Sequence, residues 1–109
     1  MIKDELIKNN YSILTSNGYF SYENGIKPVI NRLNEDINFF KGLVVVDKVV
    51  GKASAMLLCL SKVKEVYALV LSKSGEEILN SYQLLYYMHT KSIANALLNY
   101  YLLFSFNIL

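Results

Sequence analysis

A chain of 109 residues with 53% hydrophobic and 18% charged residues is long enough for one folded domain and too apolar to be disordered. Its formal charge of +2 is spread over dispersed lysines and acids, so we expect no nucleic-acid partner, because such proteins usually present a clustered basic face. The one cysteine, Cys59, cannot form an internal disulfide, and the N-terminus lacks a signal-peptide pattern, so we expect a cytoplasmic protein.

The first third of the chain predicts a helix, a β-hairpin and a second helix. The apolar residues of 2–7 have helical spacing. Predicted strands at 11–16 and 19–22 flank an Asn-Gly pair, the strongest short-range signal for a hairpin. Pro28 suits the first turn of the helix that follows.

The middle of the chain predicts a strand–helix–strand unit. Leu43–Val46 is a continuous run that is typical of a strand buried on both faces. Apolar residues at helical spacing follow as far as Leu60, which predicts a helix that starts at Asp47. Residues 65–71 form a second apolar run, so the unit is a right-handed βαβ.

The end of the chain predicts a short helix from Ser74, a strand at 82–88 and a last helix from Thr90 to about Leu103. After Glu77 the only charged side chain is Lys91. Amides spread through this tail are costly in hydrocarbon, so we expect it to be buried or covered by a partner and not to span a membrane. Its aromatic residues favour a contact between subunits of a homo-oligomer.

These elements predict a single domain over residues 1–109, with a divergent apolar segment at 82–109. The predicted class is α/β, with three layers (α/β/α) around a mixed sheet. An N-terminal antiparallel hairpin lies beside the central parallel βαβ unit.

One cluster of polar residues falls at the predicted end of the valine-rich strand. Asp47, Lys48, Gly51 and Lys52 follow that strand, and ligands of open α/β sheets bind at the carboxyl ends of strands. A helix N-terminus offers N–H groups to an anion, and the two lysines, one turn apart, would share a helix face. Lys27, in a turn, can add a positive charge at the same end of the sheet. The cluster predicts a site for a small anionic or nucleotide-like ligand.

The same residues have a plain structural interpretation, which the sequence leaves open. Asp47 can be only a helix N-cap, Gly51 a close-packing position and the lysines solvated side chains. Turn chemistry alone explains the glycine and proline around Lys27. A third interpretation is a metal-free enzyme that uses Asp47 with one of the lysines, although no nucleophile–base pair is visible.

Four short segments carry a family resemblance: residues 11–12, 25–28, 47–53 and 63–68. In order and spacing they resemble domain-of-unknown-function family 1893, a prokaryotic family with a cytidine-deaminase-like fold. The stretch Asp-Lys-Val-Val-Gly-Lys-Ala is the most specific part. The resemblance covers about residues 1–80, because the family's C-terminal Cys-Pro-Met-Glu-like motif is absent from this chain.

The cytidine-deaminase-like fold implied by the resemblance raises the question of zinc chemistry. Zinc deamination needs three His or Cys ligands and a glutamate. The chain has one Cys and one His, so we expect no metal, no cofactor and no zinc-dependent deaminase activity. Cys59 is then a core residue, and His89 a surface or capping residue. The predicted function is non-catalytic ligand binding or, alternatively, self-association or partner docking through the aromatic C-terminal third.

Overall fold

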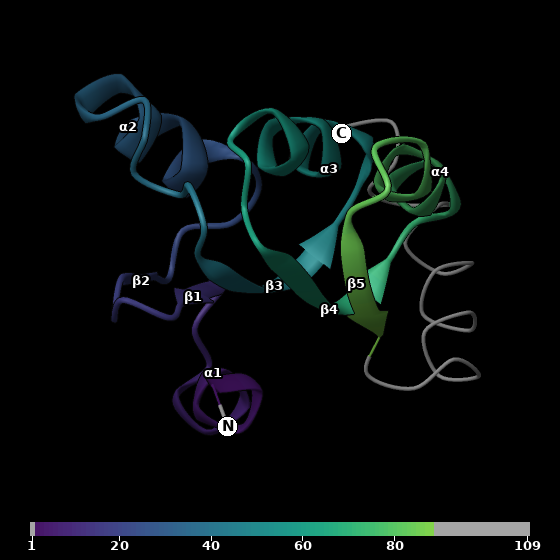
Figure 1. The fold of residues 1–109 in the computed structure, drawn as a ribbon. Coiled ribbons are helices and arrows are strands. Elements are labelled where there is room, and N and C mark those ends of the chain that lie inside the picture. The colour runs from purple at the N-terminus through teal and green to yellow at the C-terminus, as the bar shows by residue number, and fades with distance from the viewer. Residues whose placement is uncertain (1, 89–109) are drawn as a thin grey trace.

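The valine-rich segment forms the centre of a five-stranded sheet in a computed structural model that describes residues 2–88 (Figure 1). The strand order is β2-β1-β3-β4-β5. The strands are β1 (Ile13–Thr15), β2 (Phe20–Ser21), β3 (Val44–Val50), β4 (Glu65–Leu71) and β5 (Leu85–Met88). The helices are α1 (Ile2–Asn9), α2 (Lys27–Glu35), α3 (Lys52–Leu60) and α4 (Lys73–Ser81).

β3 and β4 form the parallel centre of the sheet. Val45 and Val46 are fully buried, because β1 and β4 pair with the two edges of β3 and side chains pack on both of its faces. The pairing of β3 with β4 runs from Val44 opposite Glu65 to the ends of both strands. Since α3 connects the two strands, the predicted βαβ unit is confirmed.

The predicted helix start at Asp47 is wrong. β3 continues to Val50, and α3 begins only at Lys52. Asp47 pairs with Ile13 of β1 on one side and with Ala68 of β4 on the other. The backbone is therefore held in ladders on both edges, and this long-range pairing outweighs the helical spacing of the residues that follow.

The predicted hairpin forms with shorter strands. Gly18 has a φ of +92°, a conformation that favours glycine, and its N–H donates to the Thr15 carbonyl at 3.0 Å. The Thr15 N–H donates in turn to the Tyr19 carbonyl at 2.9 Å. The turn thus places β2 antiparallel to β1 at one edge of the sheet.

The described helices cover the two faces of the sheet unequally. Figure 1 shows α2, α3 and α4 over one face and α1 on the other, which confirms the predicted three-layer arrangement. The larger core lies under the three helices and includes Leu58 and Leu79, both fully buried. The smaller core joins Leu6 of α1 to Leu14 and Val46 of the sheet.

The first turn of α4 packs against the C-terminal end of β3. The Ser72 hydroxyl caps this helix by accepting from the Gly75 N–H at 2.9 Å, and the Ser72 N–H donates to the Val50 carbonyl at 3.0 Å. A Cβ on Gly75 would lie 2.8 Å from the Val50 carbonyl oxygen and 3.1 Å from that of Gly51. A glycine is therefore needed where α4 packs against the β3–α3 connection.

β5 is the last described strand and pairs in parallel with β4. It is shorter than the predicted strand at 82–88, because Tyr82 is the C-cap of α4. His89, the predicted helix from Thr90 and the rest of the apolar tail lie outside the described residues. Within residues 2–88, no helix has the length and apolar character needed to cross a membrane.

Candidate functional site

Asp47 lies inside the sheet, in the middle of β3 and before the start of α3. Its side chain is 6% exposed, and strand alternation puts it on the same face as Val45, in the larger core. Burial raises the pKa of the carboxyl to about 7, although hydrogen bonds from the backbone N–H groups of Val49 and Lys48 partly oppose this increase. In this position the carboxyl is closed off from solvent.

The two predicted lysines do not share a helix face. Lys48 is in β3, where alternation points it away from Asp47, and its Nζ donates to Oδ1 of Asn10 at 2.7 Å. Asn10 directly follows α1, so Lys48 faces the α1 side of the sheet. Lys52 is the exposed first residue of α3, which lies over the other face (Figure 1).

The β3–α3 junction is filled by protein. Gly51 is the buried N-cap of α3 and has extended backbone, and its carbonyl oxygen lies close to Gly75. Lys27 is the exposed first residue of α2, and within residues 2–88 it has no hydrogen bond or ion pair with the other predicted site residues.

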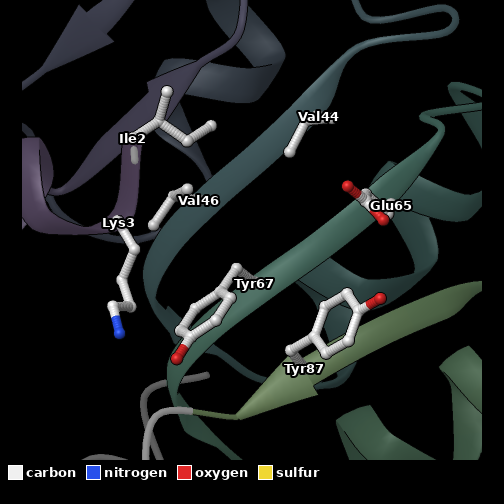
Figure 2. A pocket seen from close by; sticks show the side chains of 7 residues that line it. All are labelled: Ile2, Lys3, Val44, Val46, Glu65, Tyr67 and Tyr87. Carbon is white, nitrogen blue, oxygen red and sulfur yellow. The ribbon is translucent and has the colours of Figure 1, made fainter.

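A hollow of about 220 Å³ lies beside α1, on the face of the sheet opposite to α2, α3 and α4 (Figure 2). Its lining residues come from one helix and three strands: Ile2, Lys3, Val44, Val46, Glu65, Tyr67 and Tyr87. We call it the α1-side trough. It forms because α1 packs on β1 and β3, so no described helix covers β4 and β5 on this face.

Two tyrosines form the aromatic part of the trough. Tyr67 of β4 and Tyr87 of β5 are register partners, and their rings stack with centroids 6.1 Å apart and planes inclined by 25°. The Lys3 Nζ lies 5.2 Å from the centroid of the Tyr67 ring, within the range of a cation–π interaction. Because Tyr87 is 48% exposed, part of its side chain is open to a further group.

The polar groups of the trough lie at opposite ends. Figure 2 shows the Lys3 ammonium and the Tyr67 hydroxyl toward one end, and the Glu65 carboxylate and the Tyr87 hydroxyl toward the other. Within residues 2–88, neither Lys3 nor Glu65 has an ion pair. The trough therefore combines a cationic end, two aromatic rings and an anionic end.

The sequence does not predict this trough, because residues 65–71 form one apolar run that is typical of a buried strand. In the structure their exposure alternates: Val66 and Ala68 are fully buried, whereas Glu65 and Tyr67 are only partly buried. Alternation of that kind is typical of a strand with one less covered face, and in the sequence its signal is the polar groups of Glu65 and Tyr67 at alternate positions. The position of Tyr87 depends on the pairing of β5 with β4, which no local pattern shows.

Among residues 2–88, no group of three His, Cys, Asp or Glu side chains could hold a metal ion. Cys59 is partly buried against the larger core, and burial raises the pKa of its thiol. A thiol that stays protonated is a poor nucleophile and a poor metal ligand. These properties agree with a packing role for Cys59.

Comparison with known proteins identifies relatives of this chain. The family described as "TM1506: Domain of unknown function (DUF1893)" matches residues 1–93, further along the chain than the resemblance suggested. The chain is also similar to the crystal structure of a DUF1893 family protein (TM1506) from Thermotoga maritima. The TM-score is 0.70 and the sequence identity 31%, over 78% of this chain and 59% of that chain, so our chain spans less than two thirds of this relative. Among curated proteins there is no match.

Proposed function

Because the chain belongs to the DUF1893 family, a family of unknown function, we propose a function from its own geometry: the domain binds a small anionic ligand with a planar ring, such as a nucleotide, in the α1-side trough. The observation that carries the proposal is the stacked Tyr67–Tyr87 pair with Lys3 beside it in an open hollow. This site differs from the one predicted at the β3–α3 junction, where α4 occupies the space beside Gly51.

The chemistry of the trough supports a ring-bearing anion. Aromatic groups pair favourably with tyrosine rings in stacked or edge-on geometry. An ammonium group with no carboxylate partner in the described chain, such as that of Lys3, attracts a phosphate or carboxylate. Val44 and Val46 provide apolar surface between the polar ends, so each part of such a ligand has a matching contact.

The size of the trough supports a small ligand. Pockets for drug-sized molecules usually measure about 300–1,000 Å³. A volume of about 220 Å³ is smaller, which suits one planar group, and the open side lets a sugar or phosphate extend toward solvent. The ligand is therefore a molecule of one or two rings rather than a long chain.

The proposal is tested by thermal unfolding of the full chain with a panel of 5′-ribonucleotides. At a free ligand concentration of ten times Kd, a ligand that binds only the folded state raises the free energy of unfolding by about 1.4 kcal/mol. This corresponds to an increase in Tm of roughly 5–10 °C. Inorganic phosphate is the ring-free probe and should give a smaller increase. No increase in Tm with any nucleotide would overturn the proposal.

Two variants and two matched controls locate the binding site. Lys3→Ala and Tyr87→Ala should abolish most of the increase in Tm. Lys8→Ala removes a lysine of α1 outside the trough, and Tyr82→Ala removes a tyrosine that is 49% exposed, close to the 48% of Tyr87. Binding that survives in both trough variants would assign the ligand to another site.

Self-association through β5 is a second candidate function. Within residues 2–88, no strand pairs with the outer edge of β5, and Leu85 and Tyr87 are 54% and 48% exposed. An apolar strand edge without charges is prone to pair with another chain. Light scattering on the full chain tests this candidate, with Leu85→Lys as the variant that should dissociate a dimer. A monomeric full chain at micromolar concentration would refute it.

Three broader expectations remain proposals. A cytidine-deaminase-like fold is supported by the mixed sheet with three layers, and a non-catalytic role by the buried state of Asp47. A cytoplasmic location is supported by the single cysteine of the chain.

A further inference from the structure

We propose that Glu65 makes the α1-side trough selective for rings that present adjacent N–H donors, such as a guanine-type ring, over rings that lack one of them. This inference rests on the proposed function, because it concerns the same trough. It adds the chemical class of the ring and the residue that selects it.

The position of Glu65 carries the inference. Glu65 is the first residue of β4 and lines the trough two residues before Tyr67, so strand alternation puts both side chains on one face. It is partly buried, and within residues 2–88 its carboxylate makes no hydrogen bond or ion pair, although its backbone pairs with β3 and β5. An ionised carboxylate only accepts hydrogen bonds, and its two oxygens can accept from two parallel N–H groups. The acceptor capacity of Glu65 is therefore available to a ligand.

The polarity of the trough orients the ligand. Lys3 and the Tyr67 hydroxyl lie toward one end in Figure 2, and Glu65 lies toward the other. A ligand whose anionic group lies at Lys3 directs the far edge of its ring toward Glu65. An N–H group at that edge would donate to the carboxylate, whereas a carbonyl oxygen there would be repelled.

The dimensions agree with this orientation. Two residues of strand span about 7 Å, so Glu65 lies roughly one ring system away from the position of Tyr67 along β4. A ring stacked over the tyrosines can therefore reach the carboxylate with its edge while its anionic substituent stays near Lys3.

A matched pair of nucleotides tests the selectivity. GMP presents a ring N–H beside an amino group, and IMP differs only by the absence of that amino group. In calorimetric titrations of the full chain we expect GMP to bind about tenfold more tightly than IMP, because a hydrogen bond to a charged group is involved. In Glu65→Gln the difference should fall below about threefold, because the variant side chain presents one acceptor oxygen and an amide N–H₂ in place of two acceptor oxygens.

The control is Glu77→Gln, which removes an exposed carboxylate of α4 outside the trough and should keep the tenfold preference. Circular dichroism of Glu65→Gln verifies that the variant is folded. Equal binding of GMP and IMP to the wild type would overturn the selectivity while leaving the proposed function intact. An unchanged preference in Glu65→Gln would also overturn the role of Glu65. If neither GMP nor IMP nor any other ribonucleotide binds, both proposals are overturned.

Discussion

Replacing Asp47 with asparagine is expected to change the pH dependence of stability. In the folded chain, burial raises the pKa of this carboxyl from 3.8 to about 7. Below pH 3.8 both states are protonated, and the difference in pKa has no effect on stability. Between the two values the unfolded state ionises while the folded state keeps its proton, so the free energy of unfolding falls as pH rises. Above pH 7 the free energy of unfolding falls no further. A pKa difference of about 3 corresponds to a total loss of about 4 kcal/mol of this free energy.

Asparagine has no such dependence, because it does not titrate. The Oδ1 of the asparagine side chain can accept from the backbone N–H groups that donate to Asp47. Its buried amide N–H₂ gains no acceptor from those groups, which lowers the free energy of unfolding by about 1–3 kcal/mol. We therefore expect Asp47→Asn to be less stable than the wild type at pH 4, by about that cost. At pH 8 it should be more stable, by up to about 3 kcal/mol.

Urea unfolding followed by circular dichroism, at intervals from pH 4 to pH 8, measures the effect. Glu77→Gln is the control, because this exposed carboxylate lies on α4, and its profile should run parallel to that of the wild type. Parallel profiles for Asp47→Asn and the wild type would refute the reasoning, since Asp47 would then titrate like an exposed aspartate.

Three further predictions concern the packing around α4 and the hairpin, and urea unfolding checks each of them. Gly75→Ala should destabilise the chain by about 1–3 kcal/mol, because its Cβ would meet the Val50 carbonyl oxygen at 2.8 Å; an unchanged midpoint would contradict the close packing. Ser72→Ala should lower the free energy of unfolding by about 0.5–2 kcal/mol, because the N-cap of α4 is lost. Ser72→Asp, which can also cap a helix, should lower it by less. Gly18→Ala should cost about 1 kcal/mol, because its φ of +92° disfavours a side chain, and a stabilised variant would exclude that strain.

Local patterns predicted most of the elements but not where the central ones end. The valine run and the Asn-Gly turn give strong signals, and both appear in the structure as expected. Val49 fits either a strand or a helix by its spacing alone. Pairing with β1 and β4 decides between them, and these partners are distant in sequence. The helix start was therefore predicted five residues too early, at Asp47 instead of Lys52.

The error in the helix start also changed where the predicted site residues lie relative to one another. On a helix, Lys48 and Lys52 would lie one turn apart, but with Lys48 in a strand they face different sides of the sheet. The trough combines residues of α1, β3, β4 and β5. Strand pairing places Tyr67 beside Tyr87, and the packing of α1 on β1 and β3 brings Lys3 to them. The sequence could indicate the exposed face of β4, but not its neighbours.

Because the described helices cover the two faces of the sheet unequally, alternate residues of β4 differ in burial. Val66 and Ala68 are sealed beneath three helices, so changes there act on whether the chain folds. Glu65 and Tyr67 face the side on which no described helix covers β4, so in the proposed function changes there alter ligand recognition and leave the buried half of the strand intact. If the proposed function holds, relatives of this chain can diverge in ligand preference along a single strand while keeping the same scaffold.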